Sequence, residues 1–297
     1  MIDQLFDTEA IGILYDPHAI LYLVAVVAVL FVGKKVNDFF TPYNLNVELT
    51  DKDNKAIAVS FTGYLLALAI ILWSVLSSES TVAETDSFWR DLGADILDTV
   101  IWGAVGIALL QVARIINDKA LLYRFDNAKE LAEDRNVGTG AVQFGSYVGS
   151  AFMVAAALSG GGDQGFGQEL LLTVIYFFAG QFAFVLFGLV YQFATKYDLH
   201  DEIAKDNAAA GLSYGLTLVS VGLLLSGYLR QYDSLIGLAL WFVIATIFLI
   251  GFRAIVDKII LPGSALDDEI AQDRNWGAAL IEGGCAIGLA LLLIASF

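Results

Sequence analysis

Eight apolar stretches constrain this chain more than any other feature. Crossing a hydrocarbon core about 30 Å thick takes roughly 20 helical residues. Inside that core the backbone must satisfy its own hydrogen bonds, so each stretch is predicted to be a helix. A hydrophobic content of 58% and a mean hydropathy of +0.70 agree with an all-α integral membrane protein. The eight stretches cover residues 19–36, 56–77, 96–116, 137–158, 170–194, 208–229, 234–256 and 276–296.

A short polar element recurs just ahead of four of these stretches. Each copy begins with Glu followed by Leu or Ile, and each ends with Asp-Asn or Asp-Arg-Asn. The four copies occupy residues 48–54, 130–136, 202–207 and 269–275. Such internal repetition indicates that one supersecondary unit has been copied. The predicted unit is a pair of membrane helices.

The copies alternate between two types. Copies one and three end in Lys-Asp-Asn and carry Ser60 and Ser213 six residues beyond the Asn. Copies two and four end in Asp-Arg-Asn and carry Gln143 and Glu282 seven residues beyond it. The chain is therefore predicted to be two homologous four-helix repeats, each made of two helix hairpins. With an even number of spans per repeat, both enter the membrane in the same sense, as parallel repeats.

We divide the chain into a first four-helix repeat over residues 1–159, a Gly-rich outer linker over residues 160–167 and a second four-helix repeat over residues 168–297. The linker lacks the Lys and the strand-to-helix context of a phosphate-binding loop. Apolar residues in the first 16 positions recur at helical spacing. They fit either an amphipathic helix on the bilayer surface or an unstructured tail.

The basic residues predict the orientation. Of 16 Lys and Arg, 14 lie in or beside the loops that carry the repeated element, and only Arg90 and Arg230 lie on the other side. By the positive-inside rule, the four elements are cytoplasmic and both termini are outside. No basic segment and no small-residue cleavage site precede the first apolar stretch, so it is predicted to be a retained span.

Charge and residue content exclude several functions. A net charge of −16 argues against nucleic acid as a partner. The acidic outer loop between the second and third spans either stays solvated or forms a vestibule that attracts cations. The single Cys285 allows no intramolecular disulfide. The segment 211–215 matches the serine-hydrolase pattern, but it lies inside a predicted membrane helix and not on a strained turn. We expect no enzyme, no cofactor and no metal site.

The repeated element is one candidate site. An Asn directly before an apolar helix is a natural N-cap, and acidic residues are favourable at a helix N-terminus. Alternatively, four copies around a pseudo-symmetry axis gather carboxylates and amides that hold a cation or receive a protein partner. The candidate residues are Glu48, Asp53, Asn54, Glu130, Asp134, Asn136, Glu202, Asp206, Asn207, Glu269, Asp273 and Asn275.

A second candidate site lies inside the membrane. Glu282 falls unambiguously within a span, where a charge is costly unless it faces the bundle interior or water. Gln143 is its equivalent in the first repeat. The two are predicted either to hydrogen-bond across a packed interface or to line an ion or proton path. Nearby, helical spacing of four predicts the ion pairs Lys34–Asp38, Arg114–Asp118 and Arg253–Asp257.

The segment 48–58, Glu-Leu-x-x-x-Asp-Asn-x-Ala-x-Ala, followed by Phe61-Thr62-Gly63-Tyr64, resembles the YjfL-like bacterial inner-membrane family, known as domain of unknown function 350. A typical member has four spans, so the chain resembles two such domains in tandem. The second half departs from the pattern, because the element at 202–207 is one residue shorter. The resemblance implies an inner-membrane location and, for some members, a role in envelope maintenance. It transfers no site residue.

Two functions follow as expectations. The first is a non-enzymatic component of an envelope-maintenance or membrane-stress assembly that docks partners through the cytoplasmic elements. The alternative is a small-ion channel or transporter with Glu282 and Gln143 lining the path. In either case the chain contacts the lipid bilayer, and association into oligomers is compatible with both.

Overall fold

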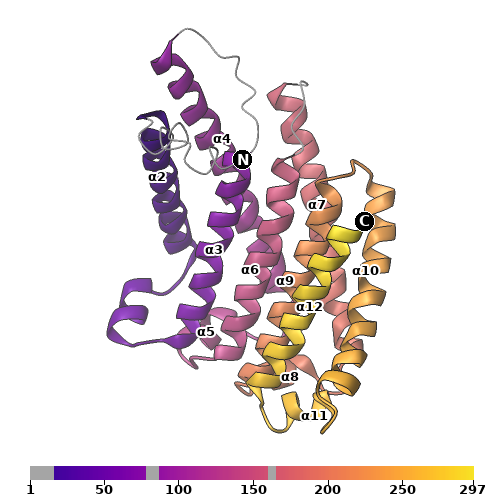
Figure 1. Cartoon of the computed structure of the whole chain (residues 1–297). Helices are drawn as coiled ribbons and strands as arrows, with labels where there is room; N and C mark the ends of the chain where they lie inside the picture. The colour runs from indigo at the N-terminus through magenta and orange to yellow at the C-terminus, as the bar shows by residue number, and fades with distance from the viewer. Residues whose placement is uncertain (1–16, 78–86, 160–164) are drawn as a thin grey trace, which may run out of the picture.

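The computed structural model describes residues 17–77, 87–159 and 165–297 (Figure 1). The first 16 residues, the acids Glu79, Glu84 and Asp86, and most of the Gly-rich linker lie outside these described residues. Eight helices are long and apolar enough to span a membrane, as predicted. They are α2 (Pro17–Phe40), α3 (Lys55–Ser77), α4 (Phe88–Ala120), α6 (Val137–Leu158), α7 (Phe166–Ala194), α9 (Ala208–Leu229), α10 (Leu235–Ile255) and α12 (Trp276–Ser296).

Each repeated element forms a short helical turn that the hydropathy pattern does not reveal. These turns are η3 (Val47–Asp51), α5 (Asn127–Ala132), α8 (Leu199–Ala204) and α11 (Leu266–Ala271). A further turn, η4 (Val256–Ile260), extends α10. Figure 1 shows α5, α8 and α11 at one end of the helix bundle, which we call the element end. A helix of five or six residues is too short to be stable alone, so each depends on its packing against the bundle.

Four helices form a central row in the order α3, α6, α9, α12, and neighbours in this row make the most extensive contacts in the molecule. All four begin at the element end and run the same way (Figure 1). The predicted parallel repeats are therefore confirmed. The first helix of each hairpin, namely α2, α4, α7 or α10, packs beside the row. Because α6 and α9 have a neighbour on both sides, they are the most buried spans.

Glycine allows the row to pack closely. A Cβ on Gly145 of α6 would overlap the backbone of Gly215 on α9, and a Cβ on Gly222 would overlap the backbone of Gly149. On the other side of α6, a Cβ on Gly140 would press on the backbone of Ala56 in α3. Helices in lipid associate through such close contacts of small residues, because the hydrophobic effect does not drive helices together inside the bilayer. These contacts position the elements at the end of the row.

Candidate functional site

Each repeated element ends in an Asn that caps the following row helix. The side-chain oxygen Oδ1 of Asn54 accepts from the backbone N–H of Ile57 at 3.2 Å, and that of Asn136 accepts from Thr139 at 3.0 Å. Asn207 and Asn275 cap α9 and α12 in the same way, accepting from Ala209 at 3.1 Å and from Gly277 at 3.0 Å. The N-cap interpretation of the element is confirmed.

The amide nitrogen of the same Asn joins neighbouring elements. Nδ2 of Asn54 donates to the backbone oxygen of Leu131 at 2.8 Å, Nδ2 of Asn136 to Ile203 at 2.6 Å and Nδ2 of Asn207 to Ile270 at 2.9 Å. We call this contact the clasp: the Asn of one element bound to the residue after the Glu of the next. These three Asn residues are at most 1% exposed. The clasps hold the four elements in register.

The Glu of each element completes the arrangement. Its carboxylate accepts from the Asn of its own element, at 3.1 Å for Glu48, 2.8 Å for Glu130, 3.1 Å for Glu202 and 2.8 Å for Glu269. Burial acts to raise the pKa of Glu48 and of Glu202. Hydrogen bonds from Lys52 and Asn54, and from Lys205 and Asn207, outweigh it and hold both pKa values below the usual range. The bond from Asn275 likewise lowers the pKa of Glu269.

One residue of every element has a left-handed backbone. Asp53, Arg135, Asp206 and Arg274 precede the capping Asn and have φ between 49° and 56°. They are the only non-glycine residues with positive φ in the described part of the chain. Such a conformation costs about 1–2 kcal/mol for an L-residue. All four residues are exposed, as are Asp134 and Asp273. We call the exposed residues 51–53, 133–135, 205–206 and 272–274 the element tips.

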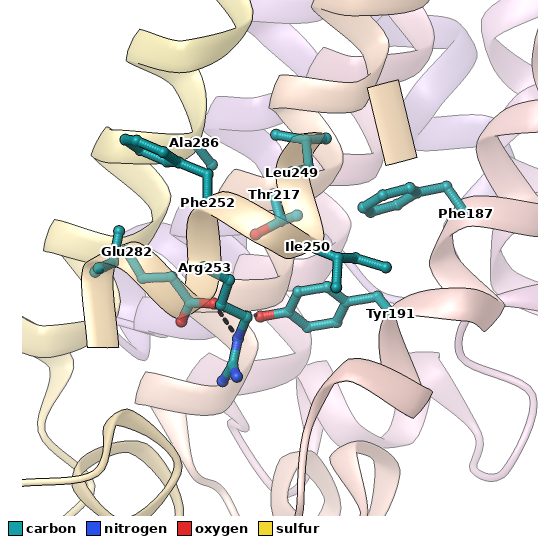
Figure 2. Close-up of a pocket in the computed structure, with 10 residues that line it drawn as sticks. Phe187, Tyr191, Thr217, Leu249, Ile250, Phe252, Arg253, Glu282 and Ala286 are labelled. Carbon is teal, nitrogen blue, oxygen red and sulfur yellow. Dashed lines mark hydrogen bonds and ion pairs between the residues drawn. The ribbon is translucent and has the colours of Figure 1, made fainter. Parts of the chain in front are cut away.

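Glu282 lies inside the second repeat in a closed polar cluster. It is 3% exposed on α12 and accepts hydrogen bonds from three other helices. The Arg253 guanidinium donates from Nε at 2.7 Å, the Tyr191 hydroxyl at 2.9 Å and the Ser213 hydroxyl at 2.6 Å. Figure 2 shows the Arg253 and Tyr191 side chains converging on the carboxylate. The guanidinium charge compensates the carboxylate in a medium where an unpaired charge is costly.

Arg253 has a different partner from the one predicted. Its Nη2 donates to Asp267 of α11 at 2.7 Å and its Nη1 to the backbone oxygen of Ala194 at 3.2 Å. The predicted pair with Asp257 is wrong, because Asp257 accepts from the backbone N–H of Leu266 at 2.6 Å and fixes the start of α11. The other two predicted pairs form, Lys34–Asp38 at 3.2 Å and Arg114–Asp118 at 3.8 Å.

Gln143 occupies the equivalent place in the first repeat. Its side-chain oxygen accepts from Ser60 at 2.6 Å, as Glu282 accepts from Ser213. Its amide donates to Asp118 at 3.1 Å. Gln143 and Glu282 therefore bond within their own repeats, and the predicted hydrogen bond between them is wrong. The reason lies in the row: Gln143 on α6 faces Ser60 of α3, whereas Glu282 on α12 faces Ser213 of α9.

A narrow cavity adjoins the Glu282 cluster. Its walls include Phe187, Tyr191, Thr217, Arg253 and Glu282 (Figure 2). The space open to the centre of a water molecule is about 10 Å³, roughly what one water requires. The walls are otherwise apolar, so the cavity gives Glu282 little contact with water.

Glu282 was predicted as a site residue from the sequence, but none of its three partners was predicted to bond to it, although two of them carried a signal. Ser213 was visible as the Ser six residues beyond the Asn in odd copies, matched to an acid or amide seven residues beyond it in even copies. Arg253 was visible in the shared Arg-x-x-x-Asp-Lys pattern. Tyr191 and Asp267 carried no such signal. Among the described residues, no group of three or more His, Cys, Asp or Glu side chains is arranged to hold a metal ion.

Comparison with known proteins gives the family. The sequence model of a family described as Domain of Unknown Function (DUF350) matches twice, over residues 8–158 and 165–297. The chain belongs to this family. It is also 24% identical over 282 residues to a UPF0719 transmembrane protein from Aquifex aeolicus (strain VF5), a match that covers 92% of this chain and 98% of that relative. No solved structure matches.

Proposed function

We propose that this DUF350 protein is a non-enzymatic, multi-pass component of the bacterial inner membrane that recruits a protein partner at its element end. The observation that carries the proposal is the fixed row of four element tips. The clasps use the Glu and Asn side chains internally, and they leave the charged tips exposed at a regular repeat. A rigid, repeated display of charge provides complementarity for a partner surface.

The orientation and the process belong to the same proposal. The distribution of basic residues supports a cytoplasmic element end with both termini outside. The resemblance of the first element to the YjfL-like pattern supports a role in an envelope-maintenance or membrane-stress assembly. The closed hydrogen bonding of Glu282 and Gln143 supports a structural role for these two residues in preference to an ion path.

The test compares two surfaces in a strain that lacks the protein. Glu133→Lys with Asp134→Lys reverses an element tip, and the matched control Gln231→Lys with Asp233→Lys adds the same kind of charge at the opposite end. Both pairs are exposed. We expect the tip variant to keep wild-type thermal stability and to lose rescue of growth under membrane stress, while the control rescues fully. A folded tip variant that rescues as well as wild type overturns the proposal.

One alternative is movement of a proton or small cation past Glu282, which lines a cavity with room for about one water. In proteoliposomes, Glu282→Gln would then abolish pH-dependent flux, because the amide keeps the shape of the side chain and cannot ionise. The Arg253 pair opposes this alternative, since a cation at Glu282 would have to displace the guanidinium. Flux that is absent in wild type, or unchanged in the variant, removes it.

A further inference from the structure

The contact between α6 and α9 joins the two repeats through two sets of three glycines. The backbones of these glycines lie against the facing helix with no room for a Cβ. Small residues at such a spacing let two membrane helices approach closely. The set on α6 is Gly138, Gly145 and Gly149, and the set on α9 is Gly211, Gly215 and Gly222.

The last helix carries the α6 half of this contact, and no described residue packs on it. Counted from its capping Asn275, α12 has glycine at the same three positions as α6 has when counted from Asn136. These are Gly277, Gly284 and Gly288. A Cβ on Gly284 or Gly288 would meet no atom of the described residues within 4 Å, and one on Gly277 would meet only Asn275. Thus α12 presents a glycine face of the kind that receives a helix elsewhere in the row.

The first helix of the row carries the matching half. When α3 is counted from Asn54 as α9 is counted from Asn207, the positions of the α9 glycines fall on Ala58, Thr62 and Ala69. All three are exposed on α3, and all three are small. The row therefore ends in two complementary faces, one on α3 and one on α12.

Larger side chains near these faces also differ in exposure between α6 and α12. Val142 and Met153 of α6 are 0% exposed, whereas Ile281 and Leu292 at the same positions of α12 are 40% and 68% exposed. Apolar exposure is normal for a helix that faces lipid, so it identifies no partner by itself. The evidence for a partner comes from the polar groups at the element end.

Asn275 is the one element Asn whose clasp is open. Among the described residues its Nδ2 donates only to Glu269, and its side chain is exposed, whereas the other three are buried. Beside it lies a groove lined by Leu261, Pro262, Ser264 and Ile281. In the three closed junctions, the corresponding space holds the next element.

A second polar contact of the α6–α9 junction has its two halves at opposite ends of the row. Within the chain, Asp206 accepts from the backbone N–H of Val137, the first residue of α6, at 3.0 Å. The equivalent residues at the two ends of the row are Asp53, which precedes the cap of α3, and Trp276, the first residue of α12. Asp53 has the same left-handed backbone as Asp206 and is exposed. A copy that docked on α12 would bring Asp53 to the N–H of Trp276.

We propose that copies of this chain associate head to tail, with α12 of one copy packed against α3 of the next through the contacts that join α6 to α9. Asn275 then clasps the backbone oxygen of Leu49 in the next copy, since Leu49 follows Glu48 as Leu131 follows Glu130. The interface is heterologous, so it builds either a closed ring or an open row in the membrane. Association of this kind does not require the proposed protein partner.

Cross-linking in lipid vesicles tests the geometry. The full chain with Asp53→Cys and Trp276→Cys, in a Cys285→Ser background, should give a ladder of covalent oligomers with a short bis-maleimide. The control pair Asp53→Cys and Phe193→Cys is also exposed at the element end and should give none. A similar ladder from the control pair overturns the proposal. So do dimers of the single variant Trp276→Cys, because they place α12 against α12.

Two matched glycine variants test the face itself. Gly284 on α12 and Gly251 on α10 are both exposed, with nothing described within 4 Å of a Cβ. Neither Gly284→Leu nor Gly251→Leu should therefore alter the fold of one chain. Gly284→Leu should abolish the ladder and leave monomers by single-molecule photobleaching, while Gly251→Leu should retain it. Equal oligomers in both variants, or monomers in wild type, overturn the proposal.

Discussion

At the scale of single residues, Glu282 combines the deepest burial of any described carboxylate with three hydrogen-bond donors. Glu282→Gln removes one of the two carboxylates that pair with Arg253, and Arg253 then keeps only Asp267 as a carboxylate partner. We expect a loss of about 1.5–3 kcal/mol, the range for hydrogen bonds to charged groups. Gln143→Leu removes the bond from Ser60 and the bond to the Asp118 carboxylate, so its loss should fall in the same range of about 1.5–3 kcal/mol.

Thermal melting of the detergent-solubilised protein measures both losses of stability. A double variant with Glu282→Gln and Arg253→Gln should be destabilised by less than the sum of the single variants, because the pair is lost only once. Strictly additive losses would contradict a direct interaction between the two residues.

The element glutamates predict a pH dependence. The pKa values of Glu48, Glu202 and Glu269 are lower in the folded protein than the ordinary value of 4.5. Their contribution to stability is therefore present above about pH 4.5, and it is lost as the pH falls through the folded pKa values. The melting temperature should fall between pH 5 and pH 3. Glu48→Gln with Glu202→Gln should flatten this fall, and an unchanged pH profile in that variant would count against the assignment.

At the scale of elements, the clasp separates two roles of the same residue type. Asn275→Ala removes a cap, worth about 1 kcal/mol, and the hydrogen bond to Glu269, and Asn207→Ala likewise loses a cap and the bond to Glu202. Asn207→Ala also leaves the backbone oxygen of Ile270 unpaired, which adds about 1–3 kcal/mol. We expect Asn207→Ala to lower the melting temperature of monomers clearly more than Asn275→Ala does. Equal losses would mean that the clasp contributes nothing.

Glycine packing gives a second comparison between equivalent positions. Gly145→Ala places a Cβ on the backbone of Gly215 and must push α6 away from α9, whereas Gly284→Ala meets nothing in the described chain. Overpacking of this kind costs about 1–3 kcal/mol. Monomer unfolding should therefore show a loss for Gly145→Ala and none for Gly284→Ala. Similar stability in the two variants would contradict the packing described for α6 and α9.

At the scale of the whole molecule, hydropathy predicted the eight spans because lipid forces every spanning backbone into a helix. The cap role of Asn54 and its copies was predictable, since it depends on local sequence alone. The clasps, and the three donors on Glu282, join residues tens of positions apart. They depend on which row helices are neighbours, which a single sequence does not specify. The left-handed Arg135 and Arg274 also gave no signal, because Arg has no preference for that backbone conformation.

Orientation is the property of the whole molecule on which the proposed function depends. The element end carries 14 of the 16 basic residues, so it should stay on the cytoplasmic side. Lys129 and Asp233 are exposed at opposite ends of the bundle. In a Cys285→Ser background, an impermeant thiol reagent added to intact cells should label Asp233→Cys and spare Lys129→Cys, and permeabilised cells should label both. Because the four row helices are parallel, all four elements lie on the same side of the membrane. An outside location for one element would therefore mean an outside location for all of them. Labelling of Lys129→Cys in intact cells would place the element tips beyond the reach of a cytoplasmic partner.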